Sequence, residues 1–363
     1  MPPRDEDFDA SLKARYTGGR IEITSDRPLR SDEEPFSLSP VEVLKSDEVA
    51  YQSELLQWRD WQLQKRYQRA RAVLSLSEAN RDRFEDLKEA VANGAAVPFV
   101  GAGLSIPCGN PGWTSFLVRL AEEAGLDLDA VEESLREGEF EMVADDLIEE
   151  MTENEFSERL RGTFVYRVEL RGAVLVLPSL FDRALITTNF DRVLEESYES
   201  ASAAFTGRVI GSDPGTFVRA LVDKAHNLLK IHGDVEDPSR RVLVRAEYNA
   251  SYGESDIDFS LPLPRVLRQA FLNHTLVFLG CSLGPDRTME LWDAVASEAD
   301  APIPRHIAII ESPETESLPR DRSVELTKRS IFPIWYPRGA HEAVEDLLTL
   351  LDAVVNDGEP IDG

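Results

Sequence analysis

Short apolar segments rich in β-branched residues recur between residues 95 and 340, and stretches with helical periodicity separate them. The apolar segments are AAVPFV at 95, ALITT at 184, NLLKI at 227, VLV at 242, TLVFLG at 275 and HIAII at 306. The helix-like stretches lie at about 113–163, 191–200, 258–272, 287–298 and 340–355. Strands that alternate with helices form a mostly parallel sheet with helices on both faces. The pattern therefore predicts an α/β fold for this region.

The chain before this region divides into two parts. Residues 1–45 mix Pro, Ser and charged residues without sustained periodicity, so we expect a disordered or irregular N-terminal arm. Residues 46–93 carry helical spacing and predict an N-terminal helical extension of two helices, split near Ser75. Trp58 and Trp61 in this extension fit either packing against the next domain or an interface with a partner. The remaining residues, 94–363, form the predicted core domain, with a helical insertion at about 113–163.

Composition excludes several classes of protein. The formal charge of -28 opposes binding to phosphate backbones, which depends on clustered Lys and Arg, so direct nucleic-acid binding is not expected. No apolar run reaches the length of a membrane helix, and the first residues lack the layout of a secretory signal, so we expect a cytoplasmic protein without a membrane span. The two cysteines, Cys108 and Cys281, cannot supply four zinc thiolates, and no metal is expected.

Two of the predicted strands end in residues that suit a nucleotide site. The glycine turn Gly101-Ala102-Gly103-Leu104-Ser105 directly follows the first strand, where the edge of an α/β sheet presents backbone N–H groups to a phosphate. Alone, such a turn is equally compatible with a structural role. The segment TTNFD, residues 187–191, follows the next strand at the same edge. Its Thr188 or Asn189 would also suit a cap for the helix that begins near Asp191.

Two later strands end in the same way. The segment KIHGD, residues 230–234, places His232 between an apolar strand and a glycine turn, where a histidine can act as a general base near neutral pH. The segment LGCSLG, residues 279–284, ends the TLVF strand in another glycine turn that suits the ribose or adenine end of a nucleotide. Because the carboxyl ends of parallel strands share one edge, the four turns are expected to face one cleft.

The ordered set GAGLS, TTNFD, KIHGD and FLGCSLG resembles the sirtuin-like (SIR2-like) family, in particular its prokaryotic antiviral-defence branch of NAD-consuming proteins. The resemblance implies a Rossmann-like sheet with NAD as the substrate. The catalytic residues that it implies are Asn189, His232 and Asp191. The residues that it implies bind NAD are Gly101, Ala102, Gly103, Ser105, Thr188, Gly280 and Ser282.

Two departures separate the chain from deacetylating sirtuins. Pro111-Gly112-Trp113 stands where those enzymes carry a Pro-Asp-Phe-Arg run, and the four-cysteine zinc module is missing. The resemblance therefore implies an NAD+ hydrolase, and not a zinc-dependent protein deacetylase. In the implied reaction the Asn189 oxygen faces the developing cation or orders a water, and His232 accepts a proton, while Asp191 holds the loop or the ribose. The products would be nicotinamide and ADP-ribose.

Other functions stay open on the sequence. The chain could bind NAD or ADP-ribose as a sensor without turnover. It could also be a subunit of a defence assembly, either a homo-oligomer or a complex with a HerA-type ATPase or an Argonaute-like protein, as the family resemblance implies. A hydride-transferring dehydrogenase is disfavoured, because the full dinucleotide-binding fingerprint and a separate substrate domain are missing.

Overall fold

The chain divides into two compact units, residues 1–69 and 70–363. The computed structural model describes residues 5–15, 21–22, 37–165, 168–211, 215–237, 240–298, 302–313 and 320–362. Each unit has an apolar core of its own, and the sites discussed below all belong to the second unit.

The first unit is built from helices. Its elements are α1 (Asp5–Arg15), the antiparallel pair β1 (Ile21–Glu22) and β2 (Ser37–Leu38), α2 (Pro40–Ser46) and most of α3 (Glu48–Leu74). Phe8 of α1 packs against Tyr51 and Trp58 of α3, and the Tyr51 hydroxyl donates to Asp9 at 2.9 Å. Trp61 is 49% exposed, with the Lys65 ammonium 3.5 Å above its ring. Trp58 therefore contributes to packing within this unit, whereas Trp61 remains on the surface.

The predicted arm, residues 1–45, differs from expectation where the structure describes it. Residues 1–4, 16–20 and 23–36 lie outside the described residues, but α1 and α2 are regular helices. The apolar residues Phe8 and Leu12 lie one helical turn apart and are both buried. Ser39 and Glu42 form a reciprocal capping box at the start of α2. The buried apolar pair and the capping box stabilise these two helices, although the composition of residues 1–45 is typical of a disordered chain.

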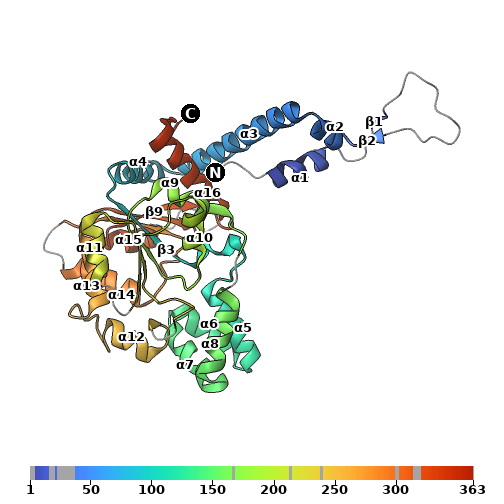
Figure 1. Ribbon diagram of the computed structural model, residues 1–363. Coiled ribbons are helices and arrows are strands. Elements are labelled where there is room, and N and C mark those ends of the chain that lie inside the picture. The colour runs from blue at the N-terminus through green and yellow to red at the C-terminus, as the bar shows by residue number, and fades with distance from the viewer. Residues whose placement is uncertain are drawn as a thin grey trace. The chain divides into compact units, whose positions relative to one another are not determined.

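A parallel sheet of seven strands organises the second unit (Figure 1). Its order is β5-β6-β4-β3-β7-β8-β9, and every described pairing is parallel. The strands are β3 (Ala96–Val100), β4 (Leu185–Thr187), β5 (Gly207–Ile210), β6 (Asn227–Lys230), β7 (Thr275–Leu279), β8 (His306–Glu311) and β9 (Ile331–Tyr336). The chain turns from β3 to β4 on one side and later returns to β7 on the other. The gap between the ends of β3 and β7 is therefore the topological switch point at which open α/β sheets bind ligands.

Helices cover both faces of the sheet (Figure 1). On one face, α11, α13, α14 and α15 bury apolar side chains against the strands in a shared core. On the opposite face, α4 packs against β3 and β9, and α16 lies nearby. The bounds are α4 (Glu78–Ala92), α9 (Leu177–Leu180), α10 (Val193–Ser200), α11 (Gly215–Asp223), α12 (Arg245–Tyr252), α13 (Pro262–Asn273), α14 (Arg287–Glu298), α15 (Arg320–Lys328) and α16 (Glu342–Asp352), which continues as a π-helical turn, Ala353–Asp357. The predicted Rossmann-like α/β fold is confirmed.

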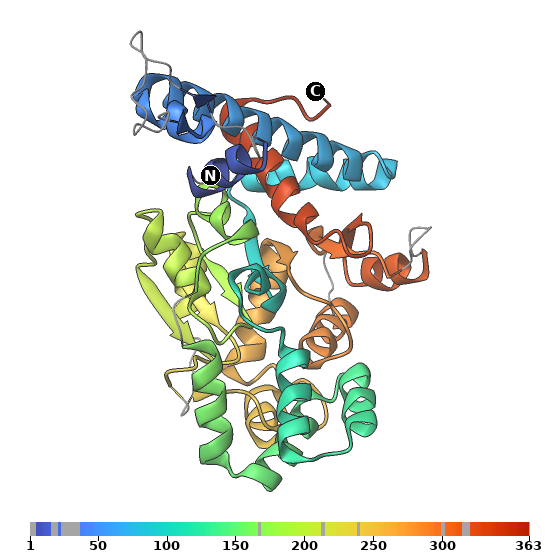
Figure 2. The ribbon, with the colours of Figure 1, turned by 90° about the vertical axis from the view of Figure 1, so that its right-hand side faces the viewer.

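Four helices form a layer beyond one end of the sheet (Figure 2). They are α5 (Trp113–Ala124), α6 (Leu128–Glu137), α7 (Phe140–Met151) and α8 (Glu153–Phe164). Their apolar faces form a second core, which also contains Phe190, Val235 and Leu243 from loops at the sheet edge. The layer occupies the position of the predicted insertion at 113–163, and its core reaches the loops that carry the candidate catalytic residues.

One predicted strand is wrong, and two strands of the seven-stranded sheet were not predicted. Residues 242–244 form a loop, in which Val242 N–H donates to the His232 carbonyl at 3.0 Å. The apolar side chains of this loop serve two different cores, because Val242 packs into the sheet core and Leu243 into the helical layer. The unpredicted strands are β5 and β9, at the two edges of the sheet. None of the described helices is both long and apolar enough to cross a lipid bilayer.

Candidate active site

A cavity of about 290 Å³ opens at the carboxyl edge of the sheet. The turns after β3, β4, β6 and β7 line it, together with parts of the helical layer and of α12 and α14. The candidate residues that line it are Gly101, Ala102, Gly103, Thr188, Asn189, Asp191, His232, Gly280 and Ser282. Ser105, the remaining candidate, is buried behind this surface and is 2% exposed. The structure thus brings together four segments that the sequence separates by up to 180 residues.

The glycine turns after β3 and β7 interlock. A Cβ atom added to Gly101 would lie 2.6 Å from the Gly280 carbonyl oxygen, and one added to Gly103 would lie 2.8 Å from the same atom. The N–H groups of Gly101 and Gly103 donate to the carbonyls of Leu279 and Gly280. These two amides are therefore occupied within the protein, contrary to the expected role of donors to a phosphate. Glycine is required at Gly101 and Gly103 because a side chain there would prevent the close contact between the two turns.

Asn189 is held in a single orientation by the turn after β3. Its side-chain Nδ2 donates to the Gly101 carbonyl at 3.2 Å and to the Ser105 hydroxyl at 3.1 Å. Because a carbonyl oxygen can only accept, the amide nitrogen must face Gly101. The Oδ1 atom then accepts a hydrogen bond from the Thr188 hydroxyl at 3.4 Å and keeps a second lone pair. Asn189 does not cap helix α10, so its oxygen remains available to the cavity.

Asp191 supports the loop. Its Oδ1 accepts from the Val193 N–H at 3.0 Å at the start of α10, where a carboxylate also suits the helix dipole. Burial raises the pKa of the Asp191 carboxyl, although the Val193 N–H, the Lys230 charge and the Ser105 hydroxyl act in the opposite direction. Neither Thr188 nor Asn189, which also suited a cap, caps α10; the Asp191 carboxylate accepts from the first N–H of the helix, one position before the N-cap residue Arg192.

His232 titrates below the range expected for a general base near neutral pH. Burial lowers the pKa of its imidazole to about 4. The Tyr248 hydroxyl lies 3.4 Å from its Nε2, and the two rings meet edge to face with centroids 5.5 Å apart. Burial also raises the pKa of Tyr248 well above 10. At physiological pH both groups are neutral, so His232 has a lone pair on one ring nitrogen with which to accept a proton.

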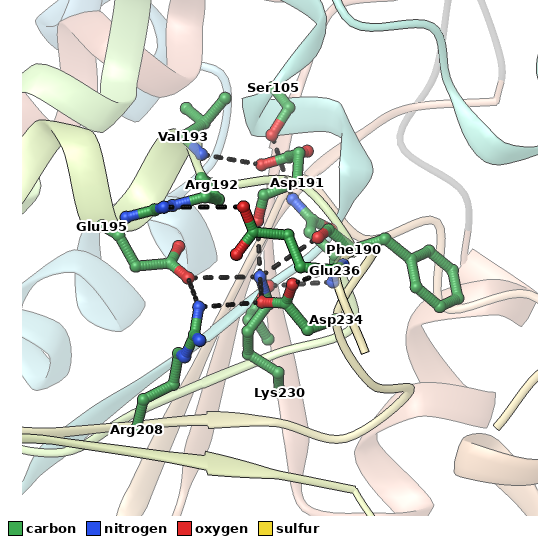
Figure 3. A network of polar contacts seen from close by, with 12 residues as sticks. Ser105, Phe190, Asp191, Arg192, Val193, Glu195, Arg208, Lys230, Asp234 and Glu236 are labelled. Atoms are coloured by element: carbon green, nitrogen blue, oxygen red, sulfur yellow. Dashed lines mark hydrogen bonds and ion pairs between the residues drawn. The ribbon is translucent and has the colours of Figure 1, made fainter. Parts of the chain in front are cut away.

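A buried ammonium connects the loops that carry Asn189 and His232 (Figure 3). The Lys230 side chain is fully buried at the end of β6. Its Nζ donates to the carbonyls of Phe190 and Asp191 at 3.1 and 2.6 Å, and contacts the carboxylates of Glu195 and Asp234 at 3.2 and 2.8 Å. Since Lys230 is two residues before His232 and holds the two residues after Asn189, it sets the position of one catalytic candidate relative to the other.

Arg208 on the edge strand β5 completes this network. Its Nη1 lies 3.5 Å from Glu195 and 3.1 Å from Asp234, so two cations face two carboxylates. Burial alone would raise the pKa of Asp234, but the charge and hydrogen bond of Lys230 hold it below its usual value. We refer to Lys230, Arg208, Glu195 and Asp234 as the buried charge network.

Several residues of the site were not predicted from the sequence. Lys230 and Asp234 stood out only as part of the segment around His232, although a lysine that ends an apolar strand was a signal for a buried ion pair. Tyr248 and Asp286, which also line the cavity, carried no local motif. The described residues contain no group of three His, Cys, Asp or Glu side chains arranged to hold a metal ion.

Residues 183–334 match the family model of the SIR2-like domain. This part of the chain is similar to a SIR2-like domain. The match includes the turns after β4, β6 and β7, and it begins after the glycine turn at Gly101.

Curated relatives extend the similarity. The chain is 26% identical over 253 residues to the NAD(+) hydrolase ThsA of Bacillus cereus (strain MSX-D12), which covers 68% of this chain and 49% of the relative. It is 26% identical over 204 residues to the protein of the same name from Cytobacillus dafuensis, covering 54% of this chain and 37% of the relative. It is 27% identical over 196 residues to the protein of the same name from Enterococcus faecium, covering 53% of this chain and 38% of the relative. The chain therefore spans half or less of the length of these homologues.

Proposed function

We propose that the chain is an NAD+ hydrolase that cleaves NAD+ to nicotinamide and ADP-ribose. The observation that carries the proposal is the convergence of Asn189 and His232 on one cavity with the glycine turns after β3 and β7. The names of the relatives, all NAD(+) hydrolases, support the choice of substrate. The position of the cavity at the switch point of the sheet supports a dinucleotide that extends across β3.

Nicotinamide leaves NAD+ as a neutral molecule from a cationic group, so the reaction needs no acid to protonate it. As the bond between the ribose C1′ and the nicotinamide nitrogen breaks, its electron pair goes to nicotinamide and positive charge develops on the ribose. The Asn189 Oδ1, whose amide is fixed by Gly101 and Ser105, faces this charge or orders the attacking water. Water then adds to C1′ to give ADP-ribose.

His232 receives the proton that the water loses. Its imidazole is already neutral because burial lowers its pKa to about 4. A base of this strength accepts a proton only as the water bonds to the cationic ribose and becomes acidic, and it then returns the proton to solvent. Tyr248, 3.4 Å from Nε2, orients the ring. In this proposal water is the only acceptor, which distinguishes the reaction from deacetylation of a lysine.

The test is nicotinamide release from NAD+ by the purified full chain, measured beside Asn189→Ala and His232→Ala. Loss of about a hundredfold or more in rate in both variants is expected for groups that act in the transition state. Asn273→Ala removes an exposed amide at the end of α13 and serves as the matched control. Release that persists in both variants would contradict the assignment.

A second candidate function is that of a sensor, which binds NAD or ADP-ribose without turnover. Nicotinamide release, measured together with ADP-ribose binding, distinguishes this sensor from a hydrolase. Calorimetric binding of ADP-ribose without nicotinamide release, with or without proteins encoded nearby, would favour the sensor. A chain that neither binds ADP-ribose nor releases nicotinamide would contradict both functions.

We further propose that the hydrolysis serves antiphage defence by depleting NAD in the cytoplasm, as part of a homo-oligomer or of a complex with a HerA-type ATPase or an Argonaute-like partner. A free NAD+ hydrolase harms its own cell, which is the reason to expect control by assembly. Light scattering of the purified chain, alone and with neighbouring gene products, tests this. A monomer that hydrolyses NAD+ at full rate and binds no such partner would contradict it.

A further inference from the structure

The charges that line the cavity are unbalanced. Among its described lining residues the carboxylic acids are Asp191 and Asp286, and none is a lysine or an arginine. Asp191 is close to the Lys230 ammonium, whose charge acts on it. Asp286 has no comparable partner: no ion pair joins it to a described cation, and the charges that act on it are the carboxylates of Glu290 and Glu141. Asp286 is therefore the unneutralised acid of the site.

The Asp286 side chain is held at the cavity by the helix that follows it. Its Oδ1 accepts from the Met289 N–H at 2.8 Å, in the first turn of α14. Burial raises the pKa of the carboxyl to about 6, so the group is ionised above that pH. Burial also raises the pKa of the cavity-lining Cys281 thiol to about 12, and the Asp286 charge adds to this shift. Asp286 and Cys281 both belong to the lining of the cavity.

The loop that carries Asp286 is fixed against the helical layer. A Cβ atom added to Gly138 would lie 1.9 Å from the Pro285 carbonyl oxygen, so the turn between α6 and α7 touches the loop directly. Arg287 lies 3.4 Å from Glu141 of α7, and its Nη2 donates to Asn249 of α12 at 3.3 Å. The carboxylate of Asp286 is consequently presented by a rigid support.

The order of the strands indicates which half of a dinucleotide meets Asp286. Asn189 and His232 follow β4 and β6, on one side of β3, whereas Asp286 follows β7 on the other side. A dinucleotide whose reactive ribose lies at Asn189 extends its other nucleoside past β3 toward β7. In dinucleotide-binding sheets an acidic residue at the adenosine ribose accepts from its hydroxyls and disfavours a 2′-phosphate.

We propose that Asp286 is a specificity-determining residue that accepts a hydrogen bond from the ribose in the adenosine half of the substrate and excludes NADP+. This inference rests on the proposed NAD+ hydrolase activity for its substrate, but it concerns a different residue and a different end of the cavity. A 2′-phosphate would bring additional negative charge to an acid that forms no ion pair with a described cation, and like charges in such contact strongly oppose binding.

The test compares NAD+ with NADP+ in the full chain and in Asp286→Asn. The asparagine retains the size of the side chain and its ability to cap α14, so the fold is preserved. Glu298→Gln, which removes a 52% exposed carboxylate from the far end of the same helix, is the matched control. We expect the wild-type chain to prefer NAD+ in kcat/KM by about tenfold or more, and Asp286→Asn to reduce that preference by about tenfold. Glu298→Gln is expected to leave the preference unchanged.

Binding of ADP-ribose and of 2′-phospho-ADP-ribose, measured by calorimetry, gives a second reading that does not depend on turnover. A preference for ADP-ribose that Asp286→Asn reduces supports the inference even if NAD+ is not hydrolysed, an outcome in which only the proposed activity fails. A ratio that is equal in the wild-type chain and in Asp286→Asn overturns the inference while leaving hydrolysis in place. Failure to bind either nucleotide overturns both.

Discussion

The charges at the two walls of the cavity are arranged in opposite ways. Behind the wall formed by β4 and β6, the Lys230 ammonium and Arg208 face the carboxylates of Glu195 and Asp234, with contacts between 2.8 and 3.5 Å. On the wall formed by β7, Asp286 lines the cavity and forms no ion pair with a described cation. Paired charges in a fixed geometry hold neighbouring groups in place. An unpaired charge does not hold neighbouring side chains in place, but it discriminates between ligands of different charge.

The comparison suggests a division of labour. The buried charge network supports the loops of Asn189 and His232, where the chemistry is proposed to occur, and disturbing it should affect stability and rate together. The β7 wall should affect the choice of ligand and the response to pH. Three predictions test this division, in order of the size of the expected effect.

Lys230→Met should produce the largest effect. The substitution removes a fully buried ammonium and leaves Arg208 as the only cation of the network beside the carboxylates of Glu195 and Asp234. Because a buried charge then lacks its partner, we expect the free energy of unfolding to fall by about 3–5 kcal/mol. Urea denaturation followed by circular dichroism measures it. Lys224→Met, which changes an exposed lysine in the turn before β6, is the control. Equal stability of the two variants would mean that the network does not support the wall.

Asp286→Asn should stabilise the protein at neutral pH. The pKa of Asp286 is raised to about 6 in the folded chain and is near 3.8 when unfolded, so the folded state resists ionisation. This penalty is absent below about pH 4, grows as the pH rises, and is complete above about 6. We expect Asp286→Asn to be more stable than the wild-type chain by roughly 2 kcal/mol at pH 7.5 and equal to it near pH 4.

Urea midpoints at the two pH values measure this difference, with Glu298→Gln as the control for loss of one negative charge. A gain in stability of the same size at both pH values would show that the effect does not come from the Asp286 carboxylate.

Tyr248→Phe should have the smallest effect. It removes a hydroxyl that lies 3.4 Å from His232 Nε2 but keeps the ring that packs edge to face against the imidazole. Loss of one neutral hydrogen bond is worth about 1 kcal/mol, so we expect kcat to fall by about fivefold with little change in KM. Steady-state kinetics with NAD+ measure it, and the substitution in the background of His232→Ala should have no further effect. A change confined to KM would argue for contact with the substrate instead of orientation of His232.

Much of the fold was predictable because the central strands have apolar middle residues and are almost fully buried. The segments at 96, 185, 227, 275 and 306 stand out in this way from the helices between them. The edge strand β5 does not have this property, because its first two residues are partly or fully exposed. The other edge strand, β9, is mostly buried like the central strands, and its Pro333 does not set it apart from β3, which contains Pro98, so its sequence did carry a signal for a strand.

Site residues could be predicted only where they lie in a short segment directly after a predicted strand. The segments around Gly101, Asn189, His232 and Gly280 each follow a strand, and the parallel sheet brings their ends together. Tyr248 and Asp286 reach the cavity through the path of α12 and of the loop before α14. That path depends on contacts such as Arg287 with Asn249, which no local pattern records.

The contact between Gly101, Gly103 and Gly280 has a consequence for how such a protein can change over generations. A side chain at Gly101 or Gly103 would collide with main-chain atoms of the turn after β7, and one at Gly280 would lie 2.6 Å from the Leu104 backbone nitrogen. A mutation in one turn therefore cannot be compensated by trimming a side chain in the other, because main-chain atoms would still collide after Cys281 or Leu104 was made smaller. The two turns should be inherited together, and recombination that exchanges one without the other should be selected against.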